Sequence, residues 1–516
     1  MARVVHQQTV DPEALDELLR PRHDLVVERV AGERSFEAAE GPVVSYRRTV
    51  DVGPTGADGR TTVTETTDFK LAMPVWGVVV LWPFKRALRH RHPDGKQPWW
   101  APPDRLDRRA TGVLGVLLTA SLVTGYLGTL LTQTITFAAD EFGADDRAQG
   151  IALAGIRTGV LISLVVMTLA DRLGRRRMLV MTAGVGCVLA ASGSVAPSLP
   201  WLAVAQGLAR SMSIALGLLI VIVAAEEMPR NSRAYSLSVL AMASGLGAGM
   251  CLWVLPVADL GERGWRVVYL VPLLGLVLVR AVHRALPETK RFARPHQQAP
   301  VRGHGHRLLL LAASAFLLQI FQAPSSQFGN EFLRDERGFS AGGISLFTIL
   351  VSTPSAIAIV VGGRLADTLG RRPVGAVGLA GGAVLSAVAF LSSGTALWLW
   401  SFLGTMIGYL TIPAVTVYGP ELFPTSLRGR ANGILVVAGV LGSAIGLVSV
   451  GFLSEEIDSL GGAIAVMAVF PVIVAFLVLT VYPETAHLEL EDINPEDATP
   501  AAPTPAPPHT DRRPRR

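Results

Sequence analysis

The stretch Asp171-Arg172-Leu173-Gly174-Arg175-Arg176-Arg177 places a cluster of charge between two apolar runs, and it occurs twice. The second copy, Asp367-Thr368-Leu369-Gly370-Arg371-Arg372, begins 196 residues later (171 to 367). Two further phrases repeat at nearly the same stride, E-x-x-P-x-x-x-R from Glu226 and Glu421, and Pro-Glu-Thr from Pro287 and Pro483. Three phrases that recur in one order at one period indicate an internal duplication. We therefore expect two copies of a unit of about 195 residues.

The composition indicates that a lipid bilayer surrounds most of the chain. Half of the 516 residues are hydrophobic, 17% are charged, and the mean hydropathy is positive. This composition is typical of multi-pass membrane proteins rather than soluble domains. The net charge of +5 does not indicate a nucleic-acid partner. The arginines lie in short loops between apolar runs, where membrane orientation accounts for them.

Twelve apolar segments follow residue 105, each near or above the roughly 20 residues that cross the hydrocarbon core. They cover about 110–138, 148–170, 178–196, 200–225, 233–256, 265–285, 308–328, 343–366, 374–392, 396–418, 430–453 and 461–482. The predicted fold is therefore an all-α membrane protein of twelve transmembrane helices. We expect two six-helix bundles, 106–286 and 307–486, joined by a central cytoplasmic loop, 287–306.

The charges of the loops predict the orientation, because short cytoplasmic loops carry an excess of Lys and Arg. Most loop arginines gather on one side, in residues 105–109, 171–177, 228–233, 284–307, 371–372 and 428–430. The opposite side receives the acidic loops at 140–146 and 454–458. We expect a multi-pass protein of the cell (cytoplasmic) membrane with both termini in the cytoplasm.

Residues 1–105 precede the first span and are expected to form a small cytoplasmic α+β region. Alternation predicts strands at 43–52 and 61–71, and a short amphipathic helix is expected at 11–20. The segment 73–90 is too short to span; it is either a helix in the membrane interface or a helix packed on the sheet. At the other end, residues 487–516 are rich in Pro, Ala and Thr and are predicted to be disordered.

No metal, cofactor or catalytic group is indicated. Cys187 and Cys251 lie inside apolar runs, as buried small hydrophobes do. His296, His304 and His306 have no Cys or carboxylate partners nearby, so a metal site is not expected. The sequence has no G-x-x-x-x-G-K-[ST] phosphate loop and no H-E-x-x-H pair, which disfavours an ATP-driven pump or an enzyme.

The paired loops resemble those of the major facilitator superfamily, nearest to its sugar-porter and metabolite-proton-symporter branches. The family signature G-x-x-x-D-R-x-G-R-R is matched, except that Thr368 replaces its first Arg, by Gly363, Asp367, Gly370, Arg371 and Arg372. In the first copy Met167 stands at the glycine position, a departure expected to loosen close packing there. The resemblance covers about 110–486. It implies two halves that rock about a central site lined by helices one, four, seven and ten.

The repeated charges are expected to form one network in each copy, stronger than on a soluble surface because part of their surroundings has a low dielectric constant. The first comprises Asp171, Arg175, Glu226 and Arg233, and the second Asp367, Arg371, Glu421 and Arg428. We expect these residues to act as a gate that clamps the two halves on the cytoplasmic side. The alternative is that they only determine topology.

Polar residues within the spans are the candidate substrate ligands, because transporter sites lie near the membrane midplane. They form stripes on helices one (Tyr126, Thr129, Gln133), four (Gln206, Arg210) and seven (Gln319, Gln322, Ser326, Asn330). The alternative role of each stripe is polar contact between helices.

Two arginines within the spans need partners, because the first six spans contain no acidic residue. Arg157 lies in helix two and Arg210 in helix four. A substrate carboxylate or phosphate would satisfy either guanidinium through paired hydrogen bonds. Arg210 could equally be a structural residue bonded to backbone.

We expect a monomeric secondary active or facilitative transporter of a small polar solute, with an organic anion as the leading candidate. Protons are a candidate coupling ion, but helix one lacks an Asp, so coupling would need Asp140, Glu141 or a loop acid. The alternatives are drug or metabolite efflux and sugar transport. A different class, a non-transporting membrane sensor, would use the N-terminal region as its output module.

Overall fold

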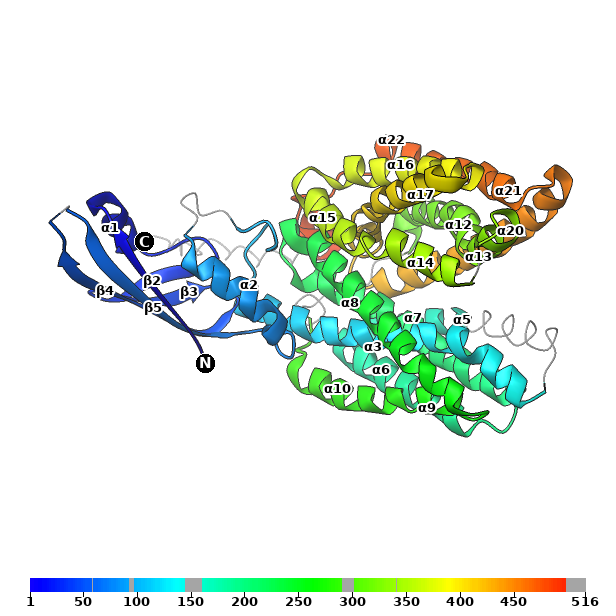
Figure 1. The fold of residues 1–516 in the computed structure, drawn as a ribbon, viewed down its shortest axis with the longest axis horizontal. Helices are drawn as coiled ribbons and strands as arrows, with labels where there is room; N and C mark the ends of the chain where they lie inside the picture. Colours follow the sequence, from blue (N-terminus) through cyan, green and yellow to red (C-terminus); the bar gives the residue numbers. More distant parts are fainter. Residues whose placement is uncertain (58, 92–96, 144–159, 290–300, 340, 498–516) are drawn as a thin grey trace, which may run out of the picture.

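The chain folds into a small antiparallel sheet followed by a long body of helices, and Figure 1 shows the sheet at one end of the molecule. This computed structural model describes residues 1–57, 59–91, 97–143, 160–289, 301–339 and 341–497. The helices of residues 108–285 form one lobe and those of residues 305–480 form the other (Figure 1). We call these lobes the N-half and the C-half, and we call the end of the body beside the sheet the sheet-proximal end.

The sheet has five antiparallel strands in the order β1-β5-β4-β3-β2. Their bounds are β1 Ala2–Val10, β2 Val27–Gly32, β3 Ser35–Glu40, β4 Val43–Thr55 and β5 Thr61–Leu71. Strands β4 and β5 lie where alternation predicts strands. Strand β1 was not predicted, because it is stabilised by pairing with a distant segment: Ala2 lies opposite Phe69.

Two helices accompany the sheet, α1 (Pro12–Leu18) and α2 (Gly77–Arg89). Asp11 starts α1 by accepting a hydrogen bond of 2.9 Å from the backbone N–H of Ala14, as an N-cap does. One face of α2 packs on the sheet, where the rings of Phe84 and Phe69 lie 5.2 Å apart. The inner face of α2 therefore belongs to the core of the sheet.

The N-half begins with the long helix α3 (Arg108–Glu141). Its other α-helices, within the described residues, are α5 (Val160–Leu173), α6 (Arg175–Ala191), α7 (Leu199–Glu227), α8 (Arg233–Val254), α9 (Trp265–Val268) and α10 (Val271–Ala285). The C-half contains α12 (Gly305–Gln327), α13 (Gly329–Glu331), α14 (Ala341–Ser352), α15 (Ser355–Thr368), α16 (Arg371–Leu391), α17 (Gly394–Tyr409), α18 (Thr411–Thr416), α19 (Tyr418–Glu421), α20 (Arg428–Ile457), α21 (Leu460–Met467) and α22 (Val469–Thr480).

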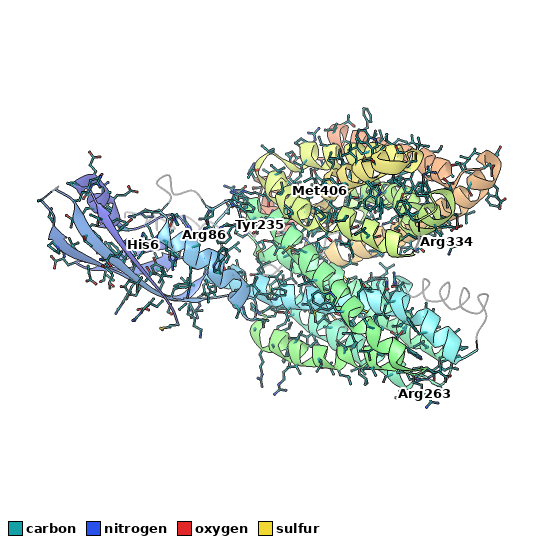
Figure 2. All side chains as sticks on the ribbon, viewed as in Figure 1. His6, Arg86, Tyr235, Arg263, Arg334 and Met406 are labelled. Carbon is teal, nitrogen blue, oxygen red and sulfur yellow. The ribbon has the colours of Figure 1, made fainter. Side chains whose placement is uncertain are left out.

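Among the residues that the structure describes, eleven helices are long and apolar enough to cross a membrane. The prediction of a helical multi-pass membrane protein is confirmed. Much of the expected second span, 148–170, lies outside the described residues, and α5 is its described end. The count of twelve spans therefore stays a prediction. Arg263 of the N-half and Arg334 of the C-half lie at the end of the body opposite the sheet (Figure 2).

The same pair of helices packs closely in each half, and glycines permit the approach. In the N-half, a Cβ added to Gly125 of α3 would lie 1.8 Å from the carbonyl oxygen of Ser244 on α8. In the C-half, a Cβ on Gly442 of α20 would lie 2.1 Å from the carbonyl oxygen of Phe316 on α12. Small residues allow backbones in membranes to approach closely. The internal repeat seen in the sequence is thus also a repeat of helix packing.

Candidate functional site

The repeated charged stretch forms the same turn in both halves. Gly174 precedes α6 with φ 99° and ψ 148°, and Gly370 precedes α16 with φ 107° and ψ 150°. Residues with a side chain rarely adopt a backbone conformation with this positive φ, so glycine is the residue that fits both turns. Each turn directs the arginine that follows it into the protein, and Arg175 and Arg371 are both buried.

The repeated Pro-Glu-Thr phrases cap these same turns, a role that sequence reasoning missed. Glu288 accepts hydrogen bonds from the backbone N–H groups of Arg175 at 3.0 Å and Arg176 at 3.2 Å. Glu484 accepts equivalent bonds from Arg371 at 3.0 Å and Arg372 at 3.1 Å. A carboxylate is favourable at a helix N-terminus because the N–H groups there lack partners within the helix. The signal in the sequence was that the two Pro-Glu-Thr phrases are separated by the same 196 residues as the two turns.

The two aspartates of the repeat bind helices of the opposite half. Asp171 at the end of α5 accepts hydrogen bonds from the N–H groups of Gly429 at 3.0 Å and Arg430 at 2.9 Å, which begin α20. Asp367 near the end of α15 accepts bonds from Ala234 at 3.2 Å and Tyr235 at 2.8 Å, which begin α8. Each half therefore supplies a carboxylate to the N-terminus of a helix in the other.

The arginines of the E-x-x-P-x-x-x-R phrases also cross between the halves. Arg428 Nη1 donates to Glu226 Oε1 at 2.8 Å, and Arg233 Nη1 donates to Glu421 Oε1 at 3.2 Å. The sequence predicts Arg233 in the network of Glu226 in its own half, and Arg428 in that of Glu421. The arginines are instead exchanged, because each begins a helix that lies along the seam between the halves.

Within each half, the expected contacts of the remaining gate residues are present. Arg175 lies 2.9 Å from Asp171 and 3.7 Å from Glu226. Arg371 lies 3.4 Å from Asp367 and forms an ion pair with Glu421. The structure thus brings together all eight residues expected at the gate, in two adjoining groups at the sheet-proximal end.

The substitution of Met167 for the signature glycine does not open a gap. Met167 is buried, and a Cβ added to Gly429 of α20 would lie 2.5 Å from its carbonyl oxygen. At the related seam a Cβ on Gly363 of α15 would lie 2.8 Å from the carbonyl oxygen of Ala234 on α8. The prediction of looser packing at Met167 is therefore wrong. The glycine that allows the close approach at this seam is Gly429 on the opposite helix, α20.

The segment after Tyr482 completes the network. The sequence predicts disorder for residues 487–516, but α23 (Leu490–Ile493) and the residues up to Asp497 are folded against this charged network. Asp497 lies 2.9 Å from Arg428, and Glu489 lies 3.3 Å from Arg233. The physical reason is that buried arginines need more acceptors than the helices supply.

The linker between the sheet and α3 crosses the seam as well. Arg364 of α15 in the C-half donates to the carbonyl oxygens of Pro98 at 3.2 Å and Trp99 at 2.8 Å. Tyr235 of α8 in the N-half donates to the carbonyl oxygen of Trp100 at 2.5 Å. Figure 2 shows Tyr235 beside the sheet-proximal end of the helical body. One short stretch of backbone therefore joins both halves.

A hollow of about 460 Å³ lies in the N-half between α3, α7 and α8. Its lining includes Thr129, one of the candidate ligands, together with Thr124 and Ser213. Arg210 approaches its wall, since its Nη1 lies 3.5 Å from the carbonyl oxygen of Gly128. Four of its twelve lining residues carry hydroxyl groups, and the others are glycine, alanine and aliphatic residues.

The other candidate ligands fall into two groups. Tyr126 donates to the carbonyl oxygen of Val268 at 2.9 Å, and Gln206 donates to that of Ala190 at 3.2 Å, so both are bonded inside the N-half. These contacts match the alternative of polar contacts between helices. Gln319 is half-buried and lies 3.5 Å from the exposed Gln322. Ser326 is exposed and Gln133 is half-buried. Arg157 and the side chain of Asn330 lie outside the described residues.

Two similar helical halves joined by exchanged charge pairs define a membrane transporter of the duplicated-bundle class. A family model described as Major Facilitator Superfamily matches residues 113–332 and 308–509. The chain therefore belongs to the major facilitator superfamily, whose members are transporters rather than enzymes.

One curated relative and several solved structures are similar to the chain. It is 28% identical over 233 residues to the cis,cis-muconate transport protein of Acinetobacter baylyi (strain ATCC 33305 / BD413 / ADP1). The match covers 42% of this chain and 55% of that protein, so the chain spans about half the length of this relative.

The solved structures agree in fold. The proton:xylose symporter XylE, with 6-bromo-6-deoxy-D-glucose bound, has a TM-score of 0.64 at 18% identity, covering 75% of this chain and 98% of its own. The human organic anion transporter MFSD10 (TETRAN) has a TM-score of 0.59 at 15% identity, covering 72% and 99%. The E. coli fucose:proton symporter FucP has a TM-score of 0.59 at 13% identity, covering 71% and 97%. At these identities the likeness establishes the fold alone.

Proposed function

We propose that this chain transports a small organic anion across the cell membrane by alternating access, as a secondary active or facilitative transporter. The observation that carries the proposal is the exchange of Arg233 and Arg428 between the halves, which joins them at the sheet-proximal end. All four guanidinium and carboxylate groups of these pairs are buried. Such pairs hold one end closed, and that end opens only when both pairs separate.

The proposed anion binds in the hollow of the N-half. Arg210 lies next to the lining, with its Nη1 3.5 Å from the carbonyl oxygen of Gly128, and a guanidinium matches a carboxylate through two parallel hydrogen bonds. Thr129 supplies a hydroxyl group on the same lining. The similarity to a cis,cis-muconate transport protein supports the assignment, because muconate is a dicarboxylate. We place the sheet-proximal end in the cytoplasm, from the arginine-rich loops at that end, and we propose a monomer.

We propose that Glu141 does not couple transport to protons. It accepts hydrogen bonds from Trp265 Nε1 at 2.7 Å and from Arg266 Nη2 at 2.9 Å. The bond to the Arg266 guanidinium holds the pKa of the Glu141 carboxyl below its usual range. A carboxylate that stays ionised at neutral pH does not carry a proton there. Coupling to protons, if the transporter uses it, resides in another acidic group.

The experiment is uptake by purified protein in liposomes, with dicarboxylates, monocarboxylates and neutral sugars offered separately. We expect uptake of carboxylates. Arg210→Gln should reduce uptake by about 10-fold to 100-fold, the loss of one charge-assisted contact. Arg334→Gln is the matched control, because it removes an exposed arginine at the opposite end of the body, and it should leave uptake unchanged. Uptake of neutral sugars alone would contradict the anion proposal, and absence of any flux would favour the membrane sensor.

A further inference from the structure

Helix α2 carries an exposed apolar stripe on the face that turns away from the sheet. Val75, Val78, Val79 and Trp82 expose 61%, 80%, 67% and 70% of their surface. Val78, Val79 and Trp82 lie on one side of α2 by their spacing of three and four residues, and Val75 lies just before the helix. The opposite side is buried on the sheet through Phe84, Ala87 and Leu88. A stripe of this size on one helix face indicates an interaction site.

The stripe begins beside a membrane-spanning helix. A Cβ added to Gly115 of α3 would lie 2.8 Å from Pro74, and Trp76 Nε1 donates to Thr119 Oγ1 of α3 at 3.1 Å. Thr119 is 11 residues beyond Arg108, the start of this apolar span, or about 16 Å along the helix axis. The chain that enters α2 thus lies alongside a stretch of α3 that is itself apolar enough for the membrane.

Basic residues continue the stripe toward the C-terminal end of α2. Arg86 and Arg89 are exposed, and the guanidinium of Arg86 lies 5.8 Å from the ring centre of Trp82. Besides these two arginines, the sequence 73–91 contains Lys85, His90 and Arg91, and it contains no acidic residue. The apolar stripe is suited to the acyl boundary of a bilayer, and the basic residues at its end are suited to the anionic headgroups.

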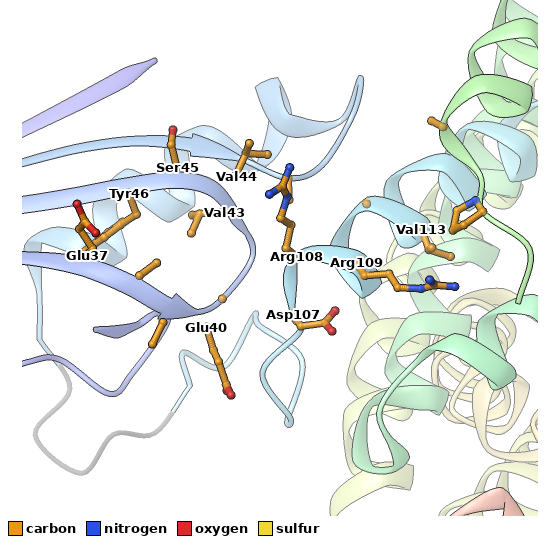
Figure 3. Close-up of a pocket in the computed structure, with 17 residues that line it drawn as sticks. Glu37, Glu40, Val43, Val44, Ser45, Tyr46, Asp107, Arg108, Arg109 and Val113 are labelled. Carbon is orange, nitrogen blue, oxygen red and sulfur yellow. The ribbon is translucent and has the colours of Figure 1, made fainter. Parts of the chain in front are cut away.

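A cavity of about 1010 Å³ separates the sheet from the start of α3, as Figure 3 shows for Val44 and Ser45 opposite Arg108. This part of the sheet is therefore not packed directly on the spanning helices. The position of the sheet relative to the spanning helices therefore depends on α2 and on the linker at 98–104. A contact made by the outer face of α2 would help to fix that position.

We propose that the outer face of α2 is a membrane anchor, with Val75, Val78, Val79 and Trp82 in the headgroup and acyl boundary of the adjoining leaflet. Lys85, Arg86 and Arg89 face its anionic headgroups. The occupant of this face is lipid, not a second protein. The anchor depends on the membrane-spanning fold and on no property of the transported solute.

The test places a nitroxide spin label on the full-length protein in liposomes that contain anionic lipid. The label is attached at Val79→Cys after replacement of the buried Cys187 and Cys251 by alanine. The matched control is Val30→Cys on β2, a valine with a similar exposure of 65%. We expect Val79 to collide more with oxygen, which concentrates in lipid, and Val30 to collide more with a water-soluble nickel chelate. Equal collision profiles at the two positions, or a label at Val79 shielded from both reagents, would overturn the anchor.

The basic residues are tested in the same assay with lipid charge as the variable. The oxygen preference at Val79 should fall when the anionic lipid is replaced by neutral lipid. Arg86→Gln combined with Arg89→Gln should remove this dependence on lipid charge. A preference that is the same in both lipids and in both proteins would contradict the headgroup contact. This assay measures no transport. Its result therefore tests the membrane anchor even if the proposed transport function is wrong.

Discussion

Arg428 of α20 and Glu226 of α7 form an ion pair of 2.8 Å that joins the two halves of the protein. Its counterpart is the pair of Arg233 and Glu421 at 3.2 Å. Both pairs are buried, so separation of the halves requires the charges to regain water or other partners. Removing one member of such a pair costs about 3–5 kcal/mol because it leaves the other charge buried without compensation.

Glu226→Gln should therefore open the sheet-proximal end. The expected shift toward the open state is on the order of 100-fold or more, from the cost of a broken buried pair. Distances between spin labels at the exposed positions Arg177→Cys and Thr368→Cys measure the opening. Glu226→Gln combined with Arg428→Gln should shift the population less than the sum of the single variants, as coupled residues do. Unchanged distances in Glu226→Gln would show that these residues determine topology only.

The two glycine turns should be equally sensitive to a side chain. Gly174→Ala and Gly370→Ala place a Cβ at φ values of 99° and 107°, and each should cost about 1–2 kcal/mol. Thermal unfolding in detergent measures the loss. Gly249→Ala is the control, since a Cβ there meets nothing within 4 Å, and a helical alanine should be neutral or slightly stabilising. A loss at Gly249 as large as at Gly174 would refute the turn argument.

The segment up to Asp497 should stabilise the closed gate. Asp497 lies 2.9 Å from Arg428 and also accepts a hydrogen bond from the backbone N–H of Thr425 at 2.9 Å. Asp497→Asn should weaken the closed state by about 1–3 kcal/mol, the usual worth of a hydrogen bond to a charged group. The same spin-label distances report the change. Removal of residues 498–516 is the control and should leave the distances as they are; an equal effect of both changes would count against a role for Asp497.

The linker should couple the sheet to the gate through Arg364. Its bonds to the carbonyl oxygens of Pro98 and Trp99 join the C-half to a segment that Tyr235 holds on the N-half. Arg364→Gln should increase hydrogen exchange at 98–104 by about tenfold, the equivalent of 1.4 kcal/mol. Thr368→Ala, one turn away and exposed, is the control. Exchange that is equal in the two variants would mean that the linker is held without Arg364.

The pair of Glu141 and Arg266 should make stability depend on pH at the opposite end. The pKa of the Glu141 carboxyl is lowered in the folded protein by its hydrogen bond to Arg266, so the pair stabilises the fold above the ordinary value of 4.5. The contribution is lost as the pH falls through the lowered pKa. The difference in Tm between the native protein and Glu141→Gln should be largest near neutral pH and disappear in acid. A difference that is constant across this range would contradict the ion pair.

Local chemistry explains why the turns and spans could be predicted. A positive-φ turn needs glycine, a membrane span needs about 20 apolar residues, and a buried charge needs a partner. These requirements act on neighbouring residues, so Gly174 and Gly370 mark the two copies without any knowledge of the fold. The alternation of side chains, which is regular over a long stretch, likewise predicted strands β4 and β5.

The charged stretch at 171–177 and its second copy therefore determined, by sequence alone, that the protein is a duplicated membrane bundle. Only the tertiary structure decided which charges meet: Arg428 with Glu226, Arg233 with Glu421, and Asp497 with Arg428. It also turned Tyr126 and Gln206 into the interior of the N-half. The physical reason is that an ion pair depends on distance in space, and the two halves bring residues about 200 positions apart into contact.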